Sequence, residues 1–212
     1  MDVLAARCTG DDVGAQARES GAVLAHVRAV TRPAHNALEG ALGLLDERLD
    51  LGAYTNVLAR LYGFWSGWEP QVATLLQDRA LSNPRRRLHL LAADLAALGV
   101  SGAAVKALPL CPLTTLHDAA EALGSLYVME GSTLGGRVIQ QNVERCLGDD
   151  GRSSCRYFNG YGANTGTMWR SFVARLDEAP VADADRIGQG AVATFERLGW
   201  WVAQVRTGHQ NA

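Results

Sequence analysis

The segment that decides the fold spans residues 126–140 and reads LYVMEGSTLGGRVIQ. It lies within a longer helical pattern, from about residue 115 to residue 147, yet it contains Gly131, Gly135 and Gly136. Each glycine inside a helix costs about 1 kcal/mol relative to alanine, against a folding stability of about 5–15 kcal/mol. We therefore expect these glycines to have a compensating role.

Helical spacing offers two such roles. Gly124, Gly131 and Gly135 fall on nearly one face of the helix, and Ser132 and Gly136 form a second pair beside them. A face without side chains lets a second helix pack closely, or lets something broad and flat lie directly against the backbone. It also lets the helix bend. Spacing alone leaves close helix packing and a planar ligand as alternatives.

Composition excludes several classes of protein. The 212 residues fit one domain, and a hydrophobic content of 48% with 20% charged residues is ordinary for a globular chain. A net charge of −2 gives no electrostatic reason to expect nucleic acid or an anionic membrane as partner. No apolar run approaches the roughly 20 residues of a membrane span, and the N-terminus lacks a signal-peptide layout, which predicts a cytoplasmic protein. Without C-x-x-C spacing, the cysteines are predicted to be free thiols: Cys8, Cys111, Cys146 and Cys155.

The chain is predicted to divide into a flexible lead-in (1–20), one helical domain (21–207) and a short tail (208–212). Helical periodicity begins near Ala22, and Pro33 is expected to interrupt it, with Thr31 capping a new start. Asp50 is predicted to cap a long helix that ends near Gln77.

The second half continues this pattern. Asn83-Pro84 is predicted to start a helix that ends at Gly99. Residues 99–112 and 148–165 are predicted as connections, and the last two helices are placed at 166–177 and 183–206. Since no convincing alternating strand is visible, the fold class predicted is all-α with a single domain.

His35 is the strongest candidate for a ligand-binding residue. Neutral imidazole is the commonest axial ligand of haem iron, and a helix bearing it would face a helix stripped of side chains. A lone histidine is nevertheless more often a surface or capping residue. The remaining histidines lack such a partner: His26, His89, His117 and His209. His89 follows three arginines and is expected to be solvated.

A haem would bring two propionates that need cations at the mouth of a pocket. Arg28 lies two turns before His35 if the helix continues through Pro33, and Arg170 is flanked by apolar residues. For each arginine, a plain surface position is the alternative. The sequence lacks the motifs of di-iron bundles, serine hydrolases and P-loop proteins.

Together these residues resemble the haem oxygenase family, and more narrowly the bacterial branch that supplies biliverdin to phytochromes. The resemblance runs from about residue 24 to residue 201. It is carried by residues 29–39 (AVTRPAHNALE), 127–136 (YVMEGSTLGG), 158–169 (FNGYGANTGTMW) and 193–196 (ATFE).

The resemblance implies a helical bundle with haem between a proximal and a kinked distal helix. His35 matches the proximal iron ligand; Gly131, Gly135 and Gly136 match the distal glycines. Arg28 matches a propionate-binding position, and Arg170 matches a second one. The implied reaction converts haem, which is both substrate and cofactor, to biliverdin, carbon monoxide and ferrous iron, with O2 and electrons from an external protein or small reductant.

One departure concerns Ser132, because many relatives carry an aspartate there that organises water near bound dioxygen. The serine puts the route of proton delivery in question. A non-catalytic haem carrier or sensor on the same fold is the alternative function, and a helical protein that binds no haem is a more distant one. Tyr157, Phe158 and Tyr161 are expected to pack a loop rather than border the pocket.

Overall fold

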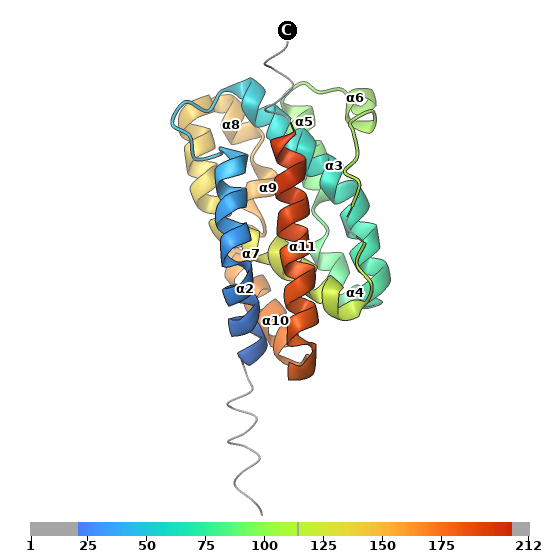
Figure 1. Ribbon diagram of the computed structural model, residues 1–212. Helices are drawn as coiled ribbons and strands as arrows, with labels where there is room; N and C mark the ends of the chain where they lie inside the picture. Colours follow the sequence, from blue (N-terminus) through green and yellow to red (C-terminus); the bar gives the residue numbers. More distant parts are fainter. Residues whose placement is uncertain (1–20, 114, 205–212) are drawn as a thin grey trace, which may run out of the picture.

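The computed structural model describes residues 21–113 and 115–204, and its regular structure there is entirely helical (Figure 1). The lead-in, the tail, Cys8 and His209 lie outside these residues. The long helices are α2 (Ala22–Leu42), α3 (Leu51–Leu76), α7 (Ala119–Leu147), α10 (Thr165–Asp177) and α11 (Ala184–Ala203). The shorter ones are α4 (Arg79–Ser82), η1 (Asn83–Arg85), α5 (Leu88–Ala97), α6 (Gly102–Lys106), α8 (Asp149–Ser153), α9 (Arg156–Asn159), η2 (Gly162–Asn164) and η3 (Val181–Asp183). The predicted all-α fold class is confirmed.

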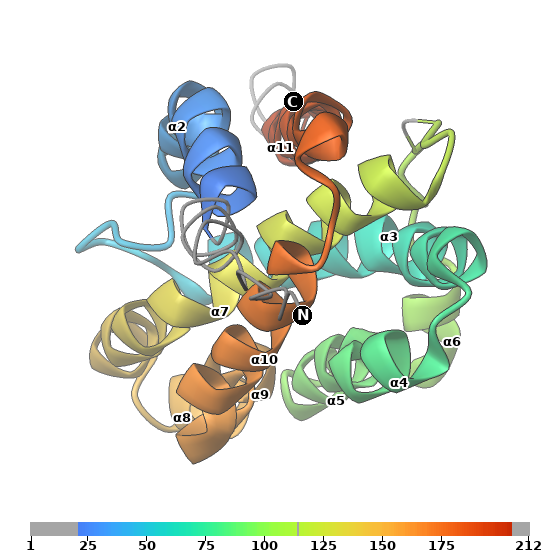
Figure 2. The ribbon, with the colours of Figure 1, turned by 90° about the horizontal axis from the view of Figure 1, so that it is seen from below.

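The helices form three layers, seen end-on in Figure 2. Helices α2 and α11 lie side by side on one face, α7 and α3 form the middle, and α5, α8 and α9 cover the other face, while α10 contacts both α7 and α2. The middle layer is held by fully buried large side chains, among them Trp65, Phe64 and Met129. None of the described helices is long and apolar enough to cross a membrane.

Helix α2 is continuous, so the interruption predicted at Pro33 is wrong. Pro33 lies inside the helix on an exposed face, where water can satisfy the carbonyl that loses its partner. Thr31 caps nothing, because its hydroxyl donates to the Val27 carbonyl oxygen at 2.7 Å within the helix. One uninterrupted helix therefore carries both Arg28 and His35, two turns apart.

Two predicted boundaries are confirmed. The Asp50 carboxylate accepts from the Ala53 N–H at 2.7 Å and starts α3. Gly99 follows α5 with a φ of 82°, as a C-terminal stop requires.

Three other boundaries differ from the prediction. Helix α5 begins at Leu88, because Asn83-Pro84 forms the separate turn η1. The connection at 99–112 contains α6, and the predicted loop at 148–165 contains α8, α9 and η2. The start of α9 is fixed by the buried carboxylate of Asp94, which accepts from the backbone N–H groups of Arg156 at 3.0 Å and Tyr157 at 2.8 Å.

Helix α7 begins at Ala119 because the Asp118 carboxylate accepts from two N–H groups of the first turn. Figure 1 shows α7 changing direction midway, so that its later turns run along the edge of the bundle. Near its start α7 crosses α11 at two glycines. A Cβ on Gly124 would collide with the Ile187 carbonyl oxygen, and one on Gly190 with the Glu121 carbonyl oxygen. The two backbones are therefore in direct contact there.

Candidate active site

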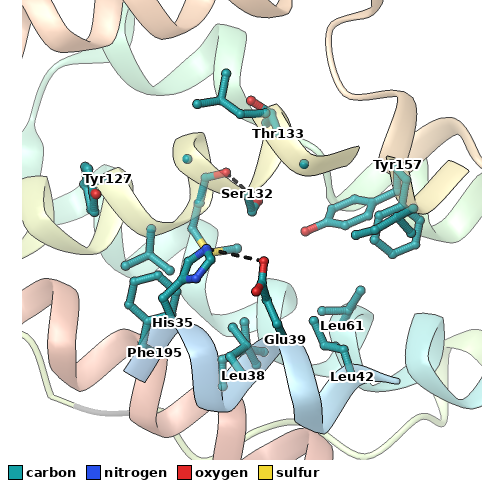
Figure 3. A pocket seen from close by; sticks show the side chains of 18 of the residues that line it. His35, Leu38, Glu39, Leu42, Leu61, Tyr127, Ser132, Thr133, Tyr157 and Phe195 are labelled. Carbon is teal, nitrogen blue, oxygen red and sulfur yellow. Dashed lines mark hydrogen bonds and ion pairs between the residues drawn. The ribbon is translucent and has the colours of Figure 1, made fainter. Parts of the chain in front are cut away.

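A cavity of about 350 Å³ lies between α2 and the middle of α7 (Figure 3). Its walls are mostly apolar, as in a typical ligand pocket. Helix α2 contributes Arg28, His35, Leu38, Glu39 and Leu42, and α7 contributes residues between Tyr127 and Ile139. We call the α2 side proximal and the α7 side distal.

His35 lies on the proximal wall with its imidazole exposed toward the cavity. About half of the side chain, 51%, is accessible, and the edge of the ring packs against Phe195 with centroids 5.6 Å apart. The Glu39 carboxylate lies one turn further on, 3.7 Å from Nε2. Figure 3 shows both side chains rising from α2 toward Ser132 on α7. The imidazole thus has space on one side and a carboxylate on the other.

The distal wall contains a strip of bare backbone. A Cβ on Gly131 would find its nearest neighbour, Trp169, at 3.9 Å, and a Cβ on Gly135 would meet nothing within 4 Å. Both glycines line the cavity. Their missing side chains leave open space and serve no packing contact.

Gly124 and Gly136 are different. A Cβ on Gly136 would collide with the Phe158 carbonyl oxygen, and Gly136 is buried and is not among the residues that line the cavity. Close helix packing therefore applies to Gly124 and Gly136, and an open face for a planar ligand applies to Gly131 and Gly135.

The two candidate arginines are placed differently. Arg28 is exposed and lines the cavity on the same wall as His35. Arg170 is exposed on α10, donates to the Thr167 hydroxyl at 3.1 Å and is not among the lining residues, although its neighbour Trp169 is.

Arg87, Tyr157 and Phe158 are among the lining residues that sequence reasoning did not assign to the cavity. Tyr157 and Phe158 border the cavity from α9, contrary to the expectation that they only pack a loop. Arg87 is only 2% exposed, whereas His89, two residues later, is exposed as predicted. No local signal marks Arg87, because its neighbours Arg85 and Arg86 have the same charge.

A second buried cluster fixes α7 from behind the cavity. Glu130 accepts from the Tyr161 hydroxyl at 2.5 Å and pairs with Arg85 Nε at 3.3 Å. Burial raises the pKa of the Glu130 carboxyl, while Tyr161 and Arg85 oppose that rise. Tyr161 therefore has the packing role expected of it, since it ties the segment after α9 to the distal helix.

The three described cysteines are free, as predicted, and none faces the cavity. Burial raises the pKa values of the Cys111 and Cys155 thiols to about 11. Both thiols are therefore protonated at neutral pH and poor nucleophiles. The ionisable side chains that line the cavity are therefore His35, Glu39 and Arg28 on the proximal side and Arg87 on the distal side, with Tyr127 and Tyr157.

Fold and site together define an all-α protein with a cleft suited to a flat macrocycle, one imidazole on the proximal wall and bare backbone on the distal wall. The family model described as "Heme oxygenase" matches residues 22–204. A protein described as "Heme oxygenase" from Xanthomonas campestris pv. campestris (strain 8004) is 33% identical over 153 residues, which cover 69% of this chain and 87% of that protein. The chain belongs to the haem oxygenase family.

Family membership makes the protein a haem oxygenase, an enzyme that binds haem and degrades it. The described residues fit that substrate. The cavity offers apolar walls for a macrocycle, a side-chain-free strip for its face, one imidazole for its iron and a cation at the rim for its propionates.

Proposed function

We propose that His35 is the axial ligand of the haem iron and that the enzyme cleaves haem to biliverdin, carbon monoxide and ferrous iron. The observation that carries the proposal is the position of an accessible imidazole directly across one cavity from the bare strip at Gly131 and Gly135. Electrons come from an external protein or small reductant, and O2 is the oxidant.

The chain's own residues hold and orient the substrate. His35 would hold the iron through one ring nitrogen, and with the ring turned Glu39 would accept from the other, which would fix the tautomer and raise ligand basicity. Gly131 and Gly135 admit the macrocycle up to the α7 backbone. Ser132, whose hydroxyl donates to the Met129 carbonyl oxygen at 2.8 Å, holds water on the distal side. Haem, once bound, supplies the oxygen-activating chemistry itself.

We further propose that the product serves as the chromophore of a bacterial phytochrome, with cleavage at the α-meso carbon. The support is the resemblance of residues 29–39 and 127–136 to the phytochrome-linked branch. Separating the biliverdin isomers by chromatography tests the position of cleavage, and transfer of the product to an apo-phytochrome tests its use. A β or δ isomer would contradict this part of the proposal alone.

The proposed reaction is tested by adding one equivalent of hemin and following the absorption spectrum under air with ascorbate or a reductase. A Soret band that decays while biliverdin absorbance grows supports the proposal. A Soret band that persists would indicate a haem carrier or sensor. If hemin addition gave no Soret shift, the proposed haem site would be wrong.

Arg28 provides a prediction for the mouth of the cavity. The Arg28→Gln variant is expected to bind hemin roughly three- to tenfold more weakly, because an exposed charge pair with a propionate contributes only about 1 kcal/mol. The matched variant is Arg170→Gln, which lies outside the cavity lining and should change hemin affinity less than twofold. Fluorescence quenching by hemin measures both values, and an equal loss in the two variants would assign Arg170 to the site as well.

A further inference from the structure

Arg87 places a buried positive charge in the distal half of the cavity. The residue immediately precedes α5, and its backbone is fixed because Glu69 Oε1 accepts from the N–H groups of Arg87 at 2.6 Å and Leu88 at 2.7 Å. The guanidinium extends to α7, where Nη2 donates to the Met129 carbonyl oxygen at 3.2 Å and to the Ser132 hydroxyl at 3.4 Å. Its side chain reaches the same turn of α7 that faces His35.

Aromatic rings surround this guanidinium. Its Cζ lies 4.6 Å from the ring centroid of Tyr157, 5.1 Å from that of Trp65 and 5.8 Å from that of Tyr161. Ring faces stabilise a cation and restrict its motion, but they do not neutralise its charge. Arg87 therefore presents a charge of fixed position and orientation.

The charge has no direct counter-ion within residues 21–113 and 115–204. No carboxylate there lies within ion-pair distance of the guanidinium, and Nε has no hydrogen-bond partner in the same part of the chain. Burial raises the pKa of Glu130 and the charge of Arg87 partly opposes that rise, but the Glu130 carboxylate is bonded to Tyr161 and paired with Arg85. Buried charges in proteins are normally paired, so this one calls for a ligand.

The neighbouring arginines behave differently. Arg85 is also buried, but it pairs with Glu130 and donates to the Leu81 carbonyl oxygen and to the Ser171 hydroxyl. Arg86 is 64% exposed and lies 3.6 Å from the second Glu69 oxygen. Of these three, only Arg87 lines the cavity and lacks an acidic partner.

We propose that Arg87 is the distal charge-supplying residue of this enzyme, and that it stabilises small anions, or the negative end of a polar diatomic ligand, bound between Ser132 and the haem. The guanidinium provides the charge that neutral Ser132 lacks and orients the Ser132 hydroxyl through its hydrogen bond. The inference rests on the proposed haem site and adds that the distal side of this site favours negatively charged ligands.

The test compares an anionic with a neutral ligand of ferric haem in the same protein. Azide and imidazole are titrated into the hemin complexes of the wild type and of Arg87→Gln, with binding followed by the Soret shift. Loss of the charge should weaken azide binding by about tenfold, the effect of one unit charge at a few ångströms in partly screened surroundings, and leave imidazole affinity within about twofold. The Arg86→Gln variant is the matched control and should behave as the wild type.

A purely structural role would weaken both ligands equally, and that result, or azide affinity unchanged in Arg87→Gln, would overturn the proposal. If Arg87→Gln does not fold, the proposal is tested with Arg87→Lys. This variant keeps the charge but loses the guanidinium hydrogen bonds to Met129 and Ser132. The C–O stretching frequency of its ferrous carbon monoxide complex should rise as the charge moves away, and an unchanged frequency with unchanged azide affinity would contradict the proposal. If hemin did not bind the wild type, the proposed haem site would fail instead.

Discussion

Replacement of His35 by alanine is expected to abolish axial ligation of haem while leaving the helical fold intact. The side chain is about half exposed and its ring makes one aromatic contact, with Phe195, so the free energy of unfolding should change by less than about 1 kcal/mol. Loss of a residue that merely supports a metal ligand typically costs 10–100-fold. Loss of the ligand itself should therefore lower the rate of haem cleavage by roughly 100-fold or more.

The measurement is the Soret spectrum of the hemin complex together with single-turnover cleavage. His89→Ala is the matched control, because His89 is exposed and outside the cavity lining. Imidazole added to His35→Ala should occupy the vacated space and restore part of the wild-type spectrum. A His35→Ala spectrum identical to that of the wild type would assign the iron to another ligand.

Replacement of Gly135 by leucine is expected to weaken haem binding without lowering the stability of the apo-protein. A Cβ at this position meets nothing within 4 Å, and leucine is the better helix former by up to about 1 kcal/mol, so the melting temperature of the apo-protein should hold or rise. The same side chain would occupy the open strip on the distal wall. Hemin binding should weaken by at least about tenfold, since the leucine must be displaced before the macrocycle can approach the backbone.

Replacement of Gly136 by alanine, a smaller change, is expected to lower the stability of the apo-protein. Its Cβ would collide with the Phe158 carbonyl oxygen, which is backbone and cannot turn aside. We expect destabilisation of about 1–3 kcal/mol in urea unfolding. If Gly135→Leu instead destabilised the apo-protein as much as Gly136→Ala, the distal strip would be a packing surface and not a ligand surface.

The sequence predicts those parts of the molecule that depend on neighbours along the chain. Helical periodicity located α3, α7, α10 and α11, and the cap at Asp50 needs only the residues that follow it. The pairing of His35 with Gly131 could be predicted because each stands out within its own helix. The structure brings the two together across one cavity.

Features that depend on distant contacts could not be predicted. Pro33 is tolerated because its face of α2 is solvated, which is a property of the assembled bundle. Short helix α9 depends on Asp94, more than sixty residues earlier. Arg87 is indistinguishable from Arg86 in sequence, and its burial requires Glu69 and aromatic rings from α3 and from residues 157–161.

Glycines at helical spacing present the same difficulty. Gly135 and Gly136 are adjacent in the chain, yet one faces open space and the other faces the Phe158 backbone. A rotation of 100° per residue separates the two environments. The spacing of glycines indicates that a helix has faces without side chains, but only the packed structure shows which atoms lie against each face.

The crossing of α7 and α11 at Gly124 and Gly190 has a mechanical consequence for substrate entry. Backbone touches backbone there, so the distance between these helices does not vary as side chains change rotamer. Helix α11 also carries Phe195, which rests against His35, and it lies along α2. We therefore expect the α2–α11 pair to change its distance from the far half of α7 mainly by rotation about this contact, so that the width of the cavity depends on the angle between the helices.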